Sequence, residues 1–89
     1  MGKVILKIKV LPHDVTQDLK TLAETIKDFL GKKGTIYRME IQPLAFGLNV
    51  IMVTLIIPEE EGTSKLEESF KQFTDAEMSI IEVSRMPDV

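Results

Sequence analysis

Apolar and polar residues alternate at the start of the chain. The apolar residues of this stretch are Val4, Leu6, Ile8 and Val10, and the lysines between them are Lys3, Lys7 and Lys9. A period of two residues is typical of a strand with one buried face. The pattern therefore predicts a strand over residues 3–11.

Apolar residues then recur at steps of three and four, the spacing of an amphipathic helix. They are Val15, Leu19, Leu22, Ala23, Ile26, Phe29 and Leu30. Asp14 and Gln17 have the spacing of a capping box, so the helix is expected to start near Val15. Gly31 is expected to end it, with two lysines beyond that favour the negative end of the helix dipole.

Three further strands and a second helix follow. Tyr37, Met39 and Ile41 alternate in a strand over residues 35–41, whereas residues 48–57 are apolar on both faces, as in a central strand. Ser64 and Glu67 form the second predicted capping box. The buried stripe of that helix is predicted to be Leu66, Phe70 and Phe73, and the last strand to contain Met78, Ile80, Ile81 and Val83.

The predicted order is β-α-β-β-α-β, which indicates an α+β fold: a ferredoxin-like sandwich with two helices on one face of a four-stranded antiparallel sheet. Right-handed crossovers place the first and third strands in the middle. Residues 1–89 are expected to form one domain, because half of this length is too short to bury a core.

Charge and composition exclude or disfavour several classes of function. Eleven Lys and Arg stand against fourteen Asp and Glu, a net charge of −3, which disfavours direct nucleic acid binding. With no cysteine and one histidine, the chain lacks the residues for a disulfide, a thiolate zinc site or a Cys/His nucleophile pair. Neither a secretion signal nor an apolar run long enough to span a membrane is present, so we expect a cytoplasmic protein.

Candidate chemical groups are few. His13 beside Asp14 lacks a second ligand at metal spacing, and Glu59 to Glu61 lacks the alternating oxygen ligands of a calcium loop, so both are interpreted as solvated segments. No phosphate-binding loop, dinucleotide fingerprint or nucleophile elbow occurs. We therefore expect no catalytic residue, no metal, no cofactor and no enzymatic reaction.

The segment from Pro43 to Leu48 is unusual, because it is an apolar loop where polar turn residues are expected. Phe46 and Gly47 also resemble a fragment of an RNA-binding motif. That interpretation fails, because the following strand carries no aromatic residue on either face for a base to stack on. Phe46 either covers the core or contacts a partner.

The sequence resembles the archaeal elongation factor 1-beta family over essentially the whole chain. The segments that carry the resemblance are this loop, the apolar strand after it, the acidic turn and the closing strand Ile80 to Arg85. The resemblance implies a guanine-nucleotide exchange factor acting on the translation GTPase elongation factor 1-alpha. In that family the loop phenylalanine enters the GTPase. The implied partner-binding residues are Pro43, Ala45, Phe46, Gly47, Leu48 and Arg85.

The chain departs from the family after the loop, where Asn49-Val50 replaces a basic pair, and near its C-terminus. Eukaryotic relatives place a lysine near the chain end into the magnesium region of the partner, but this chain has Asp88 there, with Arg85 as the nearby cation. Two other classes remain open. A ligand-sensing or oligomerisation domain of the same fold predicts a stable dimer, and an RNA-binding module predicts retention on RNA that falls with salt.

Overall fold

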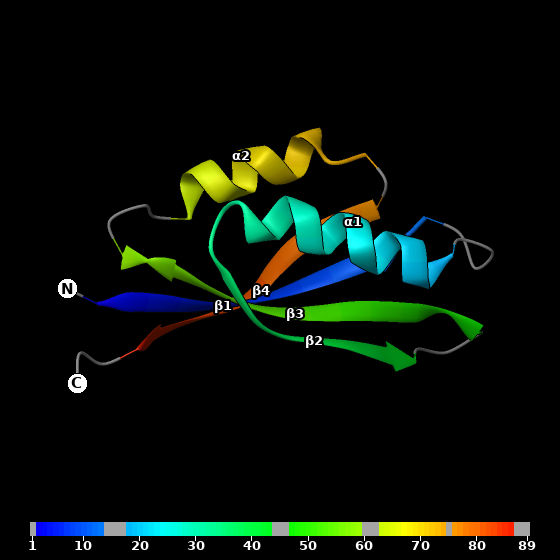
Figure 1. The fold of residues 1–89 in the computed structure, drawn as a ribbon, viewed down its shortest axis with the longest axis horizontal. Helices are drawn as coiled ribbons and strands as arrows, with labels where there is room; N and C mark the ends of the chain where they lie inside the picture. Colours follow the sequence, from blue (N-terminus) through cyan, green and yellow to red (C-terminus); the bar gives the residue numbers. More distant parts are fainter. Residues whose placement is uncertain (1, 14–17, 44–46, 60–62, 75, 87–89) are drawn as a thin grey trace.

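The computed structural model describes residues 2–13, 18–43, 47–59, 63–74 and 76–86. Its elements are β1 (Lys3–Pro12), α1 (Leu19–Gly31), β2 (Thr35–Pro43), β3 (Asn49–Pro58), α2 (Ser64–Gln72) and β4 (Ala76–Met86). The strands are ordered β2-β3-β1-β4, and each neighbouring pair is antiparallel. Both helices cover one face of the sheet (Figure 1). The α+β ferredoxin-like fold is thus confirmed, with β1 and β3 in the centre.

The core lies between the helices and the sheet. Residues of the two central strands that pair in register, such as Leu6 with Leu55 and Ile8 with Val53, are almost fully buried. The helices contribute Leu22, Ile26, Leu30, Leu66 and Phe70. Removing these side chains from water is the main force that holds the layers together. The predicted stripe of α2 is confirmed, with Phe73 packed against the core at its end.

The start of α1 differs from the prediction. Its N-cap is Asp18, whose carboxylate accepts hydrogen bonds from the Lys20 amide at 3.1 Å and from the Thr21 hydroxyl at 2.8 Å. These bonds satisfy a free amide of the first turn, so the helix begins at Leu19. The start near Val15 and the Asp14 cap are wrong, and residues 14–17 lie outside the described part of the chain.

The Asp18 carboxyl also has a lowered pKa. The largest cause is the hydrogen bond from the Thr21 side chain, and the second is the bond from the Lys20 amide. Both bonds favour the charged form of the carboxylate.

A register shift interrupts the alternation predicted for β2. Ile36 pairs with Leu55, but the next paired residue of β2 is Arg38, which pairs with Thr54. Tyr37 is therefore the extra residue of a β-bulge and is 70% exposed. As a result Ile36 and Met39 pack against the core, and the predicted grouping of Tyr37 with Met39 is wrong.

The second capping box is also wrong. Thr63 occupies the N-cap of α2 and makes no side-chain cap bond, while Ser64 is the first helical residue.

The last strand is longer than predicted, because β4 pairs with β1 from Pro12 opposite Ala76 to Lys3 opposite Met86. In the described part of the chain, neither helix is long and apolar enough to cross a membrane.

Candidate functional site

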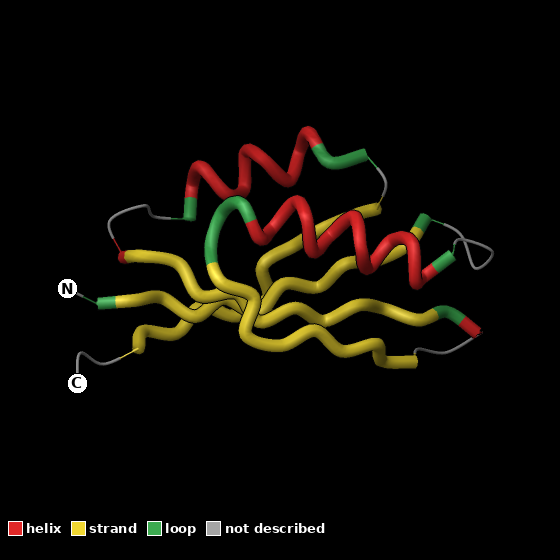
Figure 2. Tube along the Cα trace, viewed as in Figure 1, coloured by secondary structure: helices red, strands yellow, loops and turns green. Residues whose placement is uncertain are grey.

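The apolar loop predicted to contact a partner connects β2 to β3 at one end of the sheet. The two strands pair up to Pro43 opposite Asn49. Pro43 and Gly47 are exposed, and Leu48 is half-buried. Ala45 and Phe46, together with Leu44, lie outside the described residues, so the structure locates this segment by its two paired ends (Figure 2).

Gly47 has a backbone conformation that favours glycine. Its φ is +76°, and an added Cβ would meet no atom within 4 Å. The position therefore needs glycine for its conformation and not for lack of space. This residue redirects the chain immediately after Phe46 and before β3 begins.

Ile41, near the end of β2, adds an exposed apolar side chain beside the loop. It pairs with Ile51 of β3, yet Ile51 is fully buried and Ile41 is 51% exposed. The difference arises because β2 is an edge strand. The sequence pattern did not mark Ile41 as a candidate contact residue. Its closeness to Pro43 was the available signal.

Arg85 lies at the opposite end of the sheet from this loop. It pairs with Val4 in the ladder between β1 and β4, next to both chain ends (Figure 1). Its guanidinium forms an ion pair with Glu59, which follows β3. The ten residues of β3 span about 30 Å. The structure therefore brings together Pro43, Gly47 and Leu48 but does not place Arg85 beside them.

Other basic residues gather at the Arg85 end. A cavity of about 350 Å³ is lined there by Lys3, Lys32, Lys33, Gly31, Gly34, Thr35, Ile56, Ile57 and Pro58, without an Asp or Glu among these described residues. The Nζ of Lys33 also lies 4.9 Å from the centre of the Phe29 ring. The sequence pattern predicts Lys32 and Lys33 as helix-end residues and does not link them to Lys3.

Two candidate groups are accounted for by local contacts. The Nε2 of His13 donates to the backbone oxygen of Thr74 at 2.9 Å, which links the end of β1 to the segment before β4. Glu59 pairs with Arg85, so it is more than part of a solvated turn, whereas Glu60, Glu61 and Asp14 lie outside the described residues. Among the residues that are described, no group of three or more His, Asp or Glu is placed to hold a metal ion.

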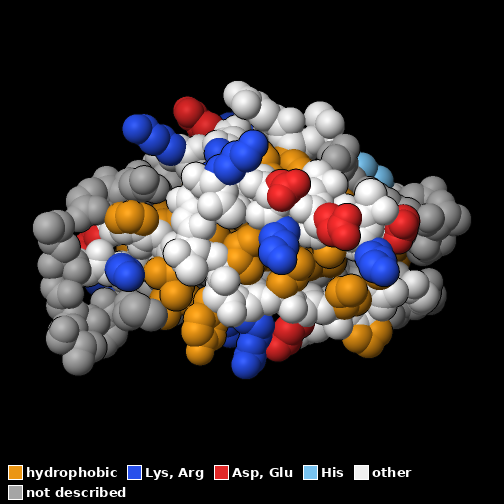
Figure 3. All heavy atoms as spheres, viewed as in Figure 1, with side chains coloured by type: hydrophobic (Ala, Val, Ile, Leu, Met, Phe, Trp, Pro, Cys, Tyr) orange, Lys and Arg blue, Asp and Glu red, His pale blue; other side chains and the backbone are white. Residues whose placement is uncertain are grey.

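The sheet face away from the helices carries charge and aliphatic side chains. Lys7 pairs with Glu82 at 3.5 Å and Arg38 with Glu40 at 3.3 Å, beside Met52 and Thr54 of β3. On the face seen in Figure 3, side chains of both signs are interspersed over α1. Neither β1 nor β3 carries an aromatic residue, so these central strands offer no stacking platform for bases.

Comparison with known proteins gives one consistent result. Residues 5–86 match the EF-1 guanine nucleotide exchange domain. A protein named elongation factor 1-beta from Methanosarcina acetivorans is 37% identical over 89 residues, covering 97% of this chain and all of the relative. The proteins of the same name from Haloarcula marismortui and Archaeoglobus fulgidus are 39% identical over 83 residues and 42% identical over 62 residues. They cover 92% and 70% of this chain, and 94% and 70% of their own lengths. The chain therefore belongs to the EF-1 guanine nucleotide exchange domain family.

Proposed function

We propose that this protein is a guanine-nucleotide exchange factor that promotes GDP release from elongation factor 1-alpha during protein synthesis. The observation that carries the proposal is the match of residues 5–86 to the EF-1 guanine nucleotide exchange domain. The relatives named elongation factor 1-beta, which align over most of their length, support it. The cytoplasm is the compartment that this function implies.

The proposed activity requires binding and no covalent chemistry. An exchange factor lowers the affinity of the GTPase for nucleotide, and by linkage the nucleotide lowers the affinity for the factor by the same ratio. A thousandfold effect corresponds to about 4 kcal/mol of differential binding. Burying one phenylalanine contributes about 1.5 to 3 kcal/mol. One inserted side chain with a few neighbouring contacts therefore reaches the required scale.

We place the inserted side chain at Phe46. The observations that support this are the exposure of Pro43 and Gly47 on either side of the segment and the paired strands that hold its ends. A loop held at both ends loses less conformational entropy on binding than a free tail. Ala45 and Leu48 are proposed to contact the partner beside Phe46, and Ile41 extends this apolar surface along β2.

The second contact is proposed at the Arg85 end. Arg85, paired with Glu59, lies at this end together with the cavity lined by Lys3, Lys32 and Lys33. Cationic side chains complement phosphate groups and carboxylates of a nucleotide-bound GTPase. Because about one strand length separates the two ends, the factor would contact two distinct areas of the GTPase.

The test is the release of a fluorescent GDP analogue from elongation factor 1-alpha of the same source, with excess unlabelled GDP. We expect substoichiometric amounts of this protein to accelerate release at least tenfold, because differences in affinity are expressed mainly in the dissociation rate. Release at the intrinsic rate, although the protein is folded, would overturn the proposal. A stable dimer in light scattering without exchange activity would instead favour a ligand-sensing or oligomerisation domain.

A further inference from the structure

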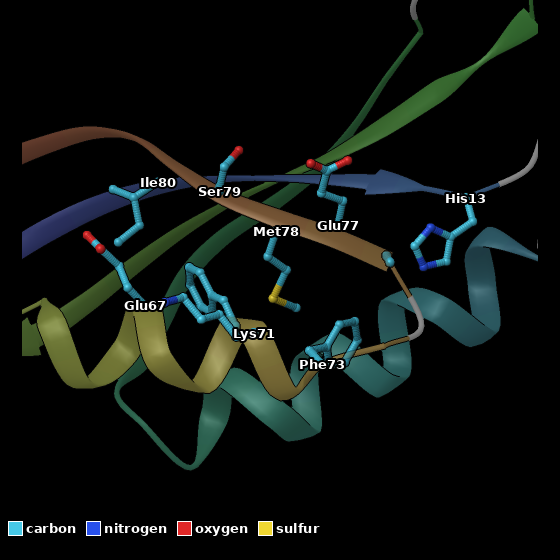
Figure 4. A pocket seen from close by; sticks show the side chains of 10 residues that line it. His13, Glu67, Lys71, Phe73, Glu77, Met78, Ser79 and Ile80 are labelled. Atoms are coloured by element: carbon cyan, nitrogen blue, oxygen red, sulfur yellow. The ribbon is translucent and has the colours of Figure 1, made fainter.

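A cavity of about 610 Å³ lies between α2 and β4, at the edge of the sheet away from β2. Figure 4 shows its walls, with α2 below and β4 above. The cavity is lined by His13, Glu67, Phe70, Lys71, Phe73, Ala76, Glu77, Met78, Ser79 and Ile80. Its volume falls in the range of sites that hold a ligand, and its inner surface is mainly apolar.

The lining residues of β4 show which way the cavity opens. Five consecutive residues, from Ala76 to Ile80, contribute to it. Neighbouring side chains of a strand point to opposite faces, so a cavity on one face would be lined by every second residue. Figure 4 shows Met78 directed toward α2, with Glu77 and Ser79 on the other side of the strand. The cavity therefore extends along the outer backbone edge of β4.

That edge is available for pairing. β4 is the outermost strand, and its ladder in the described part of the chain is with β1 alone. An outermost strand directs the backbone N–H and C=O groups of alternate residues away from the sheet. Beyond Ile80 the register with β1 shifts, because Ile8 pairs with Ile80 while Lys7 pairs with Glu82. The regular edge thus ends where the cavity ends.

The opposite wall is one face of α2. Glu67, Phe70 and Lys71 are spaced by three and four residues, and Phe73 continues this face at the helix end. A helix face that runs beside a free strand edge forms a groove for an extended peptide, which gains backbone hydrogen bonds from the strand and places alternate side chains against the helix.

The charged side chains that line the groove indicate which residues a bound peptide would carry. Glu77, on the β4 wall, has no ion-pair partner among the described residues, whereas Glu67, on the α2 wall, lies one helical turn from Lys71, which lines the same cavity. Glu82, further along β4, is by contrast paired with Lys7 at 3.5 Å. An occupant that carries Lys or Arg on the side of Glu77 would compensate this carboxylate, while its apolar residues lie against α2.

We propose that the groove between α2 and β4 binds an extended segment of a partner protein, in which apolar residues alternate with Lys or Arg, as a fifth strand antiparallel or parallel to residues 76–80. The apolar side chains would contact Phe70, Phe73 and Met78. The basic ones would lie on the side of Glu77. This surface is separate from the loop after Pro43, and the inference does not depend on the exchange function.

The test uses the full chain, labelled with ¹⁵N, and the probe peptide acetyl-Lys-Val-Lys-Val-Lys-Val-amide. We expect the amide signals of residues 76–80 and of α2 to shift most on titration. A peptide of the same composition in two blocks, three lysines and then three valines, serves as the control and should bind more weakly. Glu77→Lys should weaken binding of the probe, whereas Glu68→Lys, on the exposed side of α2, should not.

Two N-methylated forms of the probe test the strand pairing itself. Methyl groups on alternate amides block the hydrogen bonds of one peptide edge. We expect one form to lose about tenfold or more in affinity, the effect of an unmade backbone bond, and the other to bind like the parent. Equal binding of both forms would overturn the proposal, as would shifts elsewhere or none at millimolar peptide. Concentration-dependent shifts of residues 76–80 without peptide would overturn it in favour of a second copy of this chain.

Discussion

Ile41 and Ile51 face each other across β2 and β3, yet one is 51% exposed and the other is fully buried. The pair lies near the Pro43 end of these strands, where β2 is the outer member. Ile81 and Val83 of β4 are exposed to a similar extent, so exposure alone does not mark a contact residue. We propose that Ile41 contacts the GTPase because it lies beside the loop.

The first prediction is that Ile41→Ser slows GDP release from elongation factor 1-alpha. Covering the exposed half of an isoleucine is worth about 1 kcal/mol, which corresponds to about fivefold in rate if the contact forms in the complex that releases GDP. The free energy of unfolding should fall by less than about 1 kcal/mol, because the side chain is exposed. Fluorescent GDP release and urea unfolding measure the two quantities.

Tyr37→Ser is the matched control for Ile41. Tyr37 lies on the same strand and is 70% exposed, but it occupies the bulge away from the loop. We expect this variant to exchange nucleotide at the parent rate. Equal losses for both variants would show that the whole edge of β2, and not the loop end, contacts the GTPase.

Replacing three of the glycines by alanine, one at a time, should change the free energy of unfolding by different amounts. A Cβ at Gly34 would lie 2.5 Å from the backbone oxygen of Ile56, so Gly34→Ala should cost about 2 kcal/mol or more through overpacking. Gly47→Ala should cost about 1 to 2 kcal/mol, because its φ of +76° is unfavourable for an L-residue. Gly31→Ala meets no atom within 4 Å and should be neutral or stabilising. Urea unfolding that ranks Gly31→Ala as the most damaging would contradict the described packing.

Asp18 should make stability depend on acid pH. Its pKa is lowered in the folded protein by the Thr21 and Lys20 hydrogen bonds, so the folded state holds the proton less tightly than the unfolded state. This contribution is complete above the unfolded value of 3.8 and is lost as the pH falls through the lower folded pKa. Asp18→Ala should therefore lower the melting temperature at pH 7, and the difference from the parent should shrink below about pH 4.

Asparagine at position 18 distinguishes the contribution of the N-cap hydrogen bond from that of the negative charge. Asp18→Asn keeps a side-chain oxygen for the helix amide and cannot titrate. Its melting temperature at pH 7 should lie between those of the parent and Asp18→Ala. A constant difference between parent and Asp18→Ala from pH 7 to pH 2 would contradict the assigned cause.

Replacing Arg85 should have only a small effect on the rate of nucleotide exchange. Its side chain is 78% exposed and paired with Glu59, so Arg85→Gln should change the free energy of unfolding by less than about 1 kcal/mol. GDP release should slow by less than about tenfold, and the effect should fade at high salt because exposed charges are screened. Lys27→Gln, an equal charge change on the exposed side of α1, is the control.

Deleting residues 87–89, which include Asp88, should also change the rate by less than about tenfold, because an acid is attracted to a magnesium ion but repelled by phosphates. A much larger loss after this deletion, or after Arg85→Gln, would make the tail an essential part of the mechanism.

The sequence was informative where one side of an element is buried. The alternation of β1 matches its buried and exposed faces, since a strand with one covered face must repeat every second residue. The pattern does not encode bulges, so the exposure of Tyr37 was missed. The N-cap of α1 was missed for a related reason: Asp14 and Asp18 offer similar side chains, and tertiary placement decides between them.

The sequence predicts a partner-binding loop as the candidate site, but it does not predict how the candidate residues are arranged in space. An apolar loop between two strands indicates a surface for a partner, and its family likeness implies which residues matter. The separation of Arg85 from that loop follows from the strand order, because Arg85 pairs with Val4 and Pro43 with Asn49 at opposite ends. The grouping of Lys3 with Lys32 and Lys33 depends on how the α1–β2 connection meets the end of β3, which local sequence does not specify.

The central claim concerns Phe46, and its control is Phe70. Phe70 is buried in the core, so Phe70→Ala should cost about 3 to 5 kcal/mol in stability and reduce exchange only through unfolding. Phe46→Ala should change the free energy of unfolding by less than about 1 kcal/mol. The two variants therefore separate a contact residue from a core residue.

The most direct measurement is the rate of fluorescent GDP release from elongation factor 1-alpha with the parent protein and with Phe46→Ala, at concentrations where both are folded. We predict that the variant is at least about tenfold slower, because an aromatic anchor at an interface contributes 2 kcal/mol or more. A variant that unfolds at a much lower temperature, or that releases GDP as fast as the parent, would contradict the role proposed for Phe46.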